Sequence, residues 1–164
     1  MSSKVATLHL VCGKIAAGKS TLVSELGQSP TTIVTREDPW LAQLYPGELH
    51  SITDYARCSA RRRRALAPHL IEVLRSGLSI ALDFPANTVG TRAWMRTLFE
   101  QAGCRHRLHY LDVADEVCKT RLRQRNESGK HEFSVGEEEF DLFTSHFVPP
   151  SAEEMFEVIL HRHC

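Results

Sequence analysis

The stretch Gly13-Lys14-Ile15-Ala16-Ala17-Gly18-Lys19-Ser20 fits the phosphate-binding loop pattern G-x-x-x-x-G-K-[ST] and directly follows a strand-like run, residues 7–12. Glycine lets such a loop curl so that successive backbone N–H groups point inward at a polyphosphate. In this pattern Lys19 reaches the β and γ phosphates, and Ser20 offers its hydroxyl to Mg²⁺. The following helix presents unpaired N–H groups to the same anion. We therefore expect a nucleoside triphosphate to be held by Gly13, Lys14, Ile15, Ala16, Ala17, Gly18, Lys19, Ser20 and Thr21.

The bulk composition is that of an ordinary single domain. The chain has 164 residues, of which 42% are hydrophobic and 24% charged, and its formal net charge is zero. No apolar run approaches the length of a membrane span, and residues 1–4 do not read as a signal peptide, so we expect no membrane contact and a cytoplasmic protein. The zero net charge argues against a global basic field for nucleic acid, so any such binding must be local.

The cysteines and histidines show no disulfide or metal-binding pattern. The five cysteines are odd in number, scattered and without C-x-x-C spacing, which favours reduced thiols over a disulfide framework or a zinc site. Among the nine histidines, His106, His109, His161 and His163 lack carboxylate or cysteine partners at ligand spacing. We expect them to serve packing or to lie at the surface.

Strand-like and helix-like segments alternate along the chain. Strands are expected at 7–12, 31–35, 78–83, 107–113 and 156–161, and helices at 19–26, 40–45, 53–76, 91–102, 118–126 and 137–146. Pro68 should kink or split the long third helix. Asp115 could cap the fifth helix. Residues 126–136 are expected to form a mobile loop. Five strands alternating with helices predict an α/β three-layer sandwich around a five-stranded parallel sheet.

Acidic residues end two of the expected strands, at the sheet edge where open parallel sheets bind ligands. Asp83 follows an apolar strand and is expected to hold Mg²⁺ together with Ser20. Asp38 follows the second strand and is expected to take the proton of a hydroxyl acceptor. Glu37 competes for this role, because strand-end geometry could aim either carboxylate. Alternatively, Asp38 only begins a turn with Pro39.

Two arginine clusters are candidates for anion binding. Arg121 and Arg125 share a helix face at i and i+4, where their repulsion is costly unless an anion is present. Aimed inward, they would neutralise charge on a transferred phosphoryl group; the alternative is a solvated face paired with Glu116 or Glu127. The four consecutive arginines at 61–64 point around a helix turn, so we expect a solvated helix, with contact to a phosphorylated acceptor or nucleic acid as the alternative.

Taken in this order, the residues resemble the P-loop kinases grouped around polynucleotide kinase, zeta toxin and chloramphenicol phosphotransferase, an AAA-type, kinase-like group of ATP-binding proteins. The resemblance rests on residues 13–20, 37–40, 82–92 and 111–125. It implies a P-loop fold of nucleotide-kinase type in one domain, 1–164, with a short lid at about 121–140. It also implies ATP and Mg²⁺ as cofactors, Asp38 as the acceptor-activating carboxylate, and Arg121 with Arg125 as lid arginines.

One position departs from the resemblance. Polynucleotide kinases place an arginine three residues after the activating carboxylate to hold the acceptor phosphate, and this chain has Leu41. A small molecule with a hydroxyl group is therefore favoured as acceptor over a nucleic-acid end. We predict an ATP-dependent phosphotransferase in which Asp38, Lys19, Arg121 and Arg125 are catalytic. The alternatives are a 5′-hydroxyl polynucleotide or nucleoside kinase, and a nucleotide-binding regulator or weak ATPase.

Overall fold

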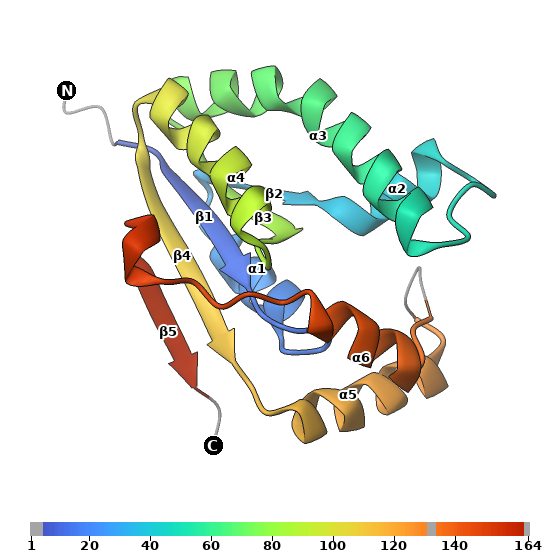
Figure 1. Cartoon of the computed structure of the whole chain (residues 1–164). Coiled ribbons are helices and arrows are strands. Elements are labelled where there is room, and N and C mark those ends of the chain that lie inside the picture. Colours follow the sequence, from blue (N-terminus) through green and yellow to red (C-terminus); the bar gives the residue numbers. More distant parts are fainter. Residues whose placement is uncertain (1–4, 131–133, 163–164) are drawn as a thin grey trace.

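Five parallel strands form one sheet at the centre of the molecule (Figure 1). The computed structural model describes residues 5–130 and 134–162. The strands are β1 (Thr7–Cys12), β2 (Thr32–Arg36), β3 (Ser79–Pro85), β4 (Arg105–Asp112) and β5 (Val158–Arg162), in the order β2-β3-β1-β4-β5. Every neighbouring pair is parallel, which confirms the predicted α/β fold with a five-stranded parallel sheet.

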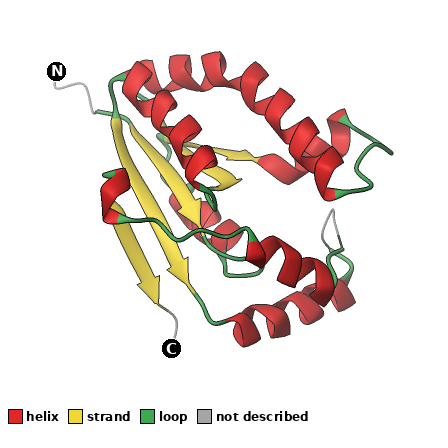
Figure 2. Ribbon diagram, in the orientation of Figure 1, coloured by secondary structure: helices red, strands yellow, loops and turns green. Residues whose placement is uncertain are grey.

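Helices cover both faces of this sheet. They are α1 (Lys19–Leu26), α2 (Glu37–Leu44), α3 (Ile52–Arg75), α4 (Val89–Ala102), α5 (Asp115–Ser128) and α6 (Glu137–Ser145), with a short 3₁₀ turn at Ala152–Glu154. Figure 2 shows α3 and α4 on one face, α1 on the other, and α5 and α6 side by side beyond the carboxyl ends of β1 and β4. Within the described residues, no helix combines the length and apolar character needed to cross a membrane.

The central strands β1 and β3 are largely buried on both faces, as parallel strands covered by helices require, whereas the edge strand β5 contains no buried residue. Alternate residues of β1 face opposite sides: Leu8 and Leu10 pack against α3 and α4, whereas Val11 packs against Val23 of α1. A separate cluster connects the loop after β1 to α5 and α6, and it consists of Ala17, Leu111, Val113, Cys118, Leu122 and Phe140. The loop is therefore part of the same packed structure as the α5–α6 pair.

Two helices differ from the sequence-based expectation. We predicted that Pro68 would kink or split the long third helix; α3 runs through Pro68 as one element, so it is not split. Leu66, Leu70 and Leu74 are buried on either side of the proline, and this packing keeps the segment helical despite the lost N–H. In α5, the N-cap is Ala114 and no side chain caps the helix, so Asp115 does not have the predicted capping role.

The predicted loop at 126–136 is also shorter than expected. Residues 126–128 belong to α5, which ends at Ser128. The amide of Asn126 then donates a hydrogen bond from Nδ2 to the carbonyl oxygen of Val135, 2.7 Å away, across this segment. Residues 131–133 lie outside the described part of the chain. The connection between α5 and α6 is thus fastened at its base.

Four cysteines have free thiols, as predicted: Cys12, Cys58, Cys104 and Cys118. Cys164 and His163 lie outside the described residues. Over residues 5–130 and 134–162, no group of three or more histidine, cysteine or acidic side chains is arranged to hold a metal ion.

Three histidines form a row across the sheet on the face of α1. Nδ1 of His9 lies 3.1 Å from Nε2 of His109, and Nδ1 of His109 lies 3.0 Å from Nε2 of His161. Burial, followed by the charges of His9, His161 and Arg107, lowers the pKa of His109 to about 4. Burial and Arg107 also lower the pKa of His9. The lowered pKa values favour the neutral imidazole at His9 and His109.

This row predicts a loss of stability in mild acid. A lowered pKa means that the folded state binds fewer protons than the unfolded state, so stability is complete above pH 6.5 and falls as the pH approaches 4. We expect His109 to account for on the order of 3 kcal/mol of this loss. In thermal melts from pH 7.5 to 4, the melting temperature of His109→Gln should fall less with decreasing pH than that of the parent. An unchanged profile would contradict the prediction, and the exposed His69→Gln is the control.

Candidate functional site

The loop of residues 13–20 joins β1 to α1, and its two glycines are needed for different reasons. Gly18 has φ of 106°, a left-handed conformation that side chains disfavour. A Cβ atom at Gly13 would lie 3.1 Å from the carbonyl oxygen of Leu111 and 3.2 Å from Cβ of Ala17. The loop is thus tightly curled and packed against the end of β4.

Asn87 fixes the start of this loop from the segment after β3. Its Oδ1 accepts a hydrogen bond from the backbone N–H of Gly13 at 2.9 Å, and its Nδ2 donates to the carbonyl oxygen of Gly13 at 2.8 Å. Both backbone groups of one residue are therefore satisfied by one side chain. The sequence contained this asparagine without indicating its role, because the pairing depends on β3 lying beside β1.

Lys19 lies inside the loop. Its Nζ donates hydrogen bonds to the carbonyl oxygens of Gly13 and Lys14, both at 2.7 Å. Burial lowers the pKa of Lys19 to about 8, although Asp83 and other groups act in the opposite direction. A bound anion would favour the charged ammonium group and reverse this shift. The geometry is that of a cation held ready for phosphate oxygens.

Ser20 and Asp83, the two predicted metal ligands, are in contact. Oγ of Ser20 donates to Oδ2 of Asp83 at 2.9 Å. A hydroxyl and a carboxylate side by side supply the oxygen ligands that Mg²⁺ prefers, so the residues fit this ion.

Arg36 is a further residue of this site that the sequence did not predict. It donates from Nη1 to the same Oδ2 of Asp83 at 2.9 Å and from Nη2 to Oγ of Ser24 at 2.7 Å. Arg36 and Asp83 are register neighbours on β2 and β3.

Glu37 is a buried structural carboxylate. It is 1% exposed at the start of α2, where Tyr55, Ser59 and Arg62 of α3 all donate hydrogen bonds to it. Tyr55 Oη lies 3.0 Å from Oε2 of Glu37. Every one of these partners ties α2 to α3.

Asp38, the next residue, is half-buried and has a different environment. Its charge acts on Lys19 of the loop and on Arg125 of α5, where it opposes the lowering of the pKa by burial, and on Tyr55 of α3, where it adds to the raised pKa. Both residues lie in the first turn of α2, which begins at Glu37, earlier than the expected 40–45. The adjacent carboxylates of Glu37 and Asp38 therefore lie in different environments.

The arginine run at 61–64 is not the uniformly solvated helix that we expected. Arg61 and Arg64 are exposed, but Arg62 is 2% exposed and its guanidinium carbon lies 4.0 Å from the ring centre of Phe84. Its ion pair with Glu37 compensates the buried charge. The expectation was wrong for Arg62 because the sequence did not reveal the buried carboxylate.

Arg121 and Arg125 lie beside the loop and Asp38, respectively. Nη1 of Arg121 is 3.3 Å from the carbonyl oxygen of Ala17. Burial lowers the pKa of Arg125, and the charge of Asp38 partly offsets this effect. Nε of Arg125 is buried without a hydrogen-bond partner among the described residues. Neither arginine forms an ion pair with Glu116 or Glu127 within the described ranges, which disfavours the solvated alternative.

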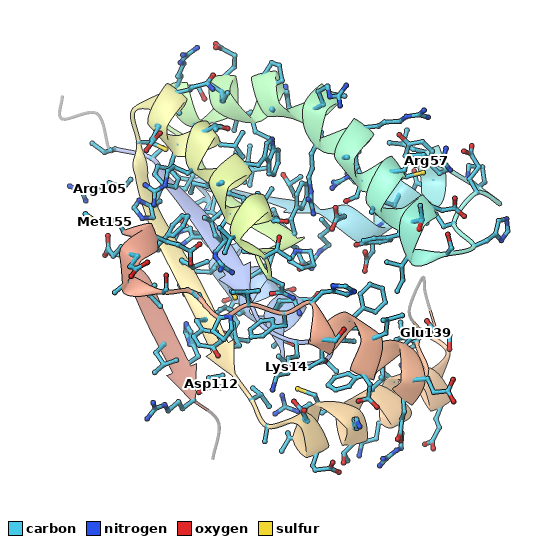
Figure 3. All side chains as sticks on the ribbon, in the orientation of Figure 1. Lys14, Arg57, Arg105, Asp112, Glu139 and Met155 are labelled. Carbon is cyan, nitrogen blue, oxygen red and sulfur yellow. The ribbon has the colours of Figure 1, made fainter. Side chains whose placement is uncertain are left out.

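Lys14 connects the loop to the start of α5, and Figure 3 shows it near the carboxyl end of the sheet. Its Nζ lies 3.3 Å from the carbonyl oxygen of Val113 and pairs with Asp115. With the contact between Arg121 and Ala17, this gives α5 two polar attachments to the loop. The site is thus bounded by the loop, the start of α2, the end of β3 and α5.

Comparison with known proteins places this geometry in a wider group. A family model described as an AAA domain matches residues 8–150. No curated protein matches the chain. Similar solved structures include a proposed kinase from Chloroflexus aurantiacus J-10-fl, with a TM-score of 0.74 and 18% identity over 97% of this chain and 86% of that one.

Two further structures share the fold and hold nucleotide analogues. Kti12 from Chaetomium thermophilum, in complex with ADP-AlF3, has a TM-score of 0.69 and 14% identity over 94% of this chain and 88% of its own. The APS kinase CysC of Mycobacterium tuberculosis, in complex with AMPPNP and APS, has a TM-score of 0.53 and 18% identity over 77% of this chain and 76% of its own. These likenesses establish a kinase-like P-loop fold.

Proposed function

This chain belongs to the AAA domain family, and from that premise we propose that it is an ATP-dependent phosphotransferase that moves the γ-phosphoryl group to a hydroxyl of a small molecule. The observation that carries the proposal is the position of Asp38, whose charge acts both on Lys19 of the loop and on Arg125 of α5. A half-buried carboxylate between two such cations suits a base beside a transferred phosphoryl group. The nucleotide analogues bound to similar folds support ATP as the donor.

The chain's own residues divide the reaction among them. The backbone and side chains of residues 13–21 hold the triphosphate, with Lys19 facing its terminal phosphates. Ser20 and Asp83 would hold Mg²⁺, which neutralises charge on the β and γ phosphates when bound. Asp38 takes the proton of the acceptor hydroxyl while the hydroxyl oxygen forms its bond to the γ-phosphorus. The bond between the γ-phosphorus and the oxygen of the β-phosphate breaks at the same time, and ADP is released. Arg121 and Arg125 stabilise the charge that develops.

The surroundings of the two adjacent carboxylates favour Asp38 over Glu37 as the base. Glu37 is enclosed by Tyr55, Ser59 and Arg62, and its charge is already compensated. A base must reach a substrate proton, which a carboxylate enclosed in this way does not do. We therefore assign Glu37 to the support of α2 and Asp38 to the reaction.

Leu41 supports an acceptor that carries no phosphate at this position. Its side chain is completely buried between α2 and the rest of the protein. The place of the phosphate-binding arginine of polynucleotide kinases is thus occupied by a core residue. A small hydroxyl compound is favoured for this reason over a phosphorylated nucleic-acid end.

We also propose that the chain is a single domain whose residues at about 121–140 act as a lid. α5 carries Arg121 and Arg125 toward the loop, and Phe140 of α6 packs with Cys118 and Leu122 of α5. The two helices would therefore move together as nucleotide enters or leaves.

A transfer assay tests the proposed activity. The protein is incubated with γ-labelled ATP and Mg²⁺ against sugars, amino alcohols, antibiotics, nucleosides and 5′-hydroxyl oligonucleotides. We expect label to appear on at least one small hydroxyl compound. Transfer confined to oligonucleotides would support a polynucleotide kinase instead, and ADP release at the same rate with and without every acceptor would support a weak ATPase or nucleotide-binding regulator.

ATP binding itself predicts a stability change that does not depend on the acceptor. At a concentration one hundredfold above its dissociation constant, ATP should stabilise the fold by about 2.7 kcal/mol, which corresponds to roughly 5–10 °C in melting temperature. Lys19→Ala should lose this shift, because the ammonium group inside the loop is removed. Melts with and without ATP and Mg²⁺ measure it, with the exposed Arg61→Ala as control. A full shift in Lys19→Ala would contradict the role of this lysine.

A further inference from the structure

A groove of about 790 Å³ lies between α3 and α4, apart from the phosphate loop. Its α3 wall is apolar at Ala67, Pro68 and Ile71, and its α4 wall contains Trp94 and Gly90. The ring of Trp94 stacks on Phe84 of β3 at 6.2 Å between centroids with an interplanar angle of 3°, which fixes its orientation. A fixed indole opposite an aliphatic wall suits a planar apolar body.

One part of this groove carries positive charge that is only partly compensated. Arg63 lines it with its guanidinium carbon 5.7 Å from the ring centre of Trp94. Its only ion pair is with Glu37 at 3.5 Å, within the described residues, and Arg62 shares that single carboxylate. Nε of Arg63 is buried and lacks a hydrogen-bond partner in the same ranges. Arg64 also lines the groove and has no ion pair with a described residue, so an anionic group would be stabilised here.

Elsewhere the groove is neutral. Arg75 pairs with Glu72 and donates from Nη2 to the carbonyl oxygen of Gln101, 2.9 Å away. The attraction for an anion is therefore confined to Arg63 and Arg64.

The charged part of the groove adjoins the candidate site. Arg63 contacts Glu37, the residue before Asp38, and Thr88 lines the groove directly after Asn87, which binds the loop at Gly13. An acceptor whose hydroxyl lay at Asp38 could thus extend between α3 and α4. Leu41 is buried and does not line this groove, so it does not oppose an anion there.

We propose that the α3–α4 groove binds the acceptor and selects an aromatic compound that bears both a hydroxyl and an anionic group, such as a carboxylate. Trp94 contacts the ring, Arg63 and Arg64 bind the anionic group, and the hydroxyl reaches Asp38. The contact between the hydroxyl and Asp38 rests on the proposed phosphotransferase activity, but binding in the groove can be measured without ATP.

A blocking substitution tests the groove without disturbing the core. Nothing lies within 4 Å of where a Cβ atom of Gly90 would be, so Gly90→Leu can place a side chain in the groove without strain. Leucine also favours a helix more than glycine does. We expect this variant to melt no lower than the parent and to keep its ATP-induced stabilisation, which establishes that it is folded.

Binding is followed with 1-anilinonaphthalene-8-sulfonate, an aromatic anion, in a Trp40→Phe background where Trp94 is the remaining tryptophan. We expect saturable quenching of Trp94, with at least tenfold weaker binding after Gly90→Leu and about tenfold weaker binding after Arg63→Gln. The exposed Arg61→Gln, a neighbour in the same run, should bind like the parent. Unchanged affinity in both Gly90→Leu and Arg63→Gln would overturn the proposal that the groove binds an aromatic anion.

Transfer assays then separate the groove from the activity. We expect 4-(hydroxymethyl)benzoate to be phosphorylated at least tenfold faster than benzyl alcohol, which lacks the carboxylate, and Gly90→Leu to abolish the difference. Equal rates for the two compounds would overturn the selection of an anionic aromatic acceptor while leaving the phosphotransferase intact. Quenching that responds to Gly90→Leu without transfer to any compound would overturn the proposed activity and the groove's role in acceptor selection, leaving only a ligand site.

Discussion

Asp38→Asn is expected to lower the rate of phosphoryl transfer by a factor of about 10²–10⁴, because the amide cannot accept the proton of the acceptor hydroxyl. ATP binding should persist, since the triphosphate is held by residues 13–21. The expected signature is therefore a low kcat together with an unchanged ATP-induced rise in melting temperature. Initial rates with a saturating acceptor, measured beside melts with ATP and Mg²⁺, test both parts.

Another carboxylate at a strand end provides the matched control for this experiment. Asp112 ends β4, is exposed, and is labelled in Figure 3 on the far side of the sheet end from α2. Asp112→Asn changes the charge by the same amount and should transfer at the parental rate. A parental rate in Asp38→Asn would reject Asp38 as the base. Equal losses in both variants would show that general charge, and not the position of Asp38, determines the rate.

The fold was predictable because each of its local signals is strong. The loop pattern identified the turn between β1 and α1, and β-branched or alternating strands separated by helices indicated a parallel sheet. The fourth helix, expected to end at residue 102, does so, and Gly103 follows it with a φ of 66°. These features depend on residues close together in the chain, which is the range over which sequence periodicity is informative.

The parts of the site that escaped prediction depend on contacts between distant residues. Arg36 reaches Asp83 only because β2 lies beside β3, and Asn87 reaches Gly13 only because β3 lies beside β1. The sequence could not decide between Glu37 and Asp38 for the same reason, since the partners of Glu37 come from α3. A polar residue at a strand end, as Arg36 is, was the one local signal available.

The partners of Glu37 lead to the largest expected loss of stability in the chain. Glu37 and Arg62 are 1% and 2% exposed, and the carboxylate also accepts hydrogen bonds from Tyr55 and Ser59. Replacing Glu37 by Ala leaves the guanidinium of Arg62 buried without its counter-charge. Removing one partner of a buried pair typically costs about 3–5 kcal/mol. We expect Glu37→Ala to lower the melting temperature by roughly 6–20 °C.

Two comparison variants distinguish the stability cost of an unpaired buried charge from the cost of lost hydrogen bonds. Asp54→Ala removes the partner of Arg57 in an exposed pair on the same helix and should change the melting temperature little. The double variant Glu37→Leu, Arg62→Met replaces the pair by apolar side chains of similar size and should recover much of the stability that Glu37→Ala loses. A parental melting temperature in Glu37→Ala would contradict the burial of this pair. A double variant as unstable as Glu37→Ala would instead assign the cost to Tyr55, Ser59 and Arg63, which both variants leave without the Glu37 carboxylate.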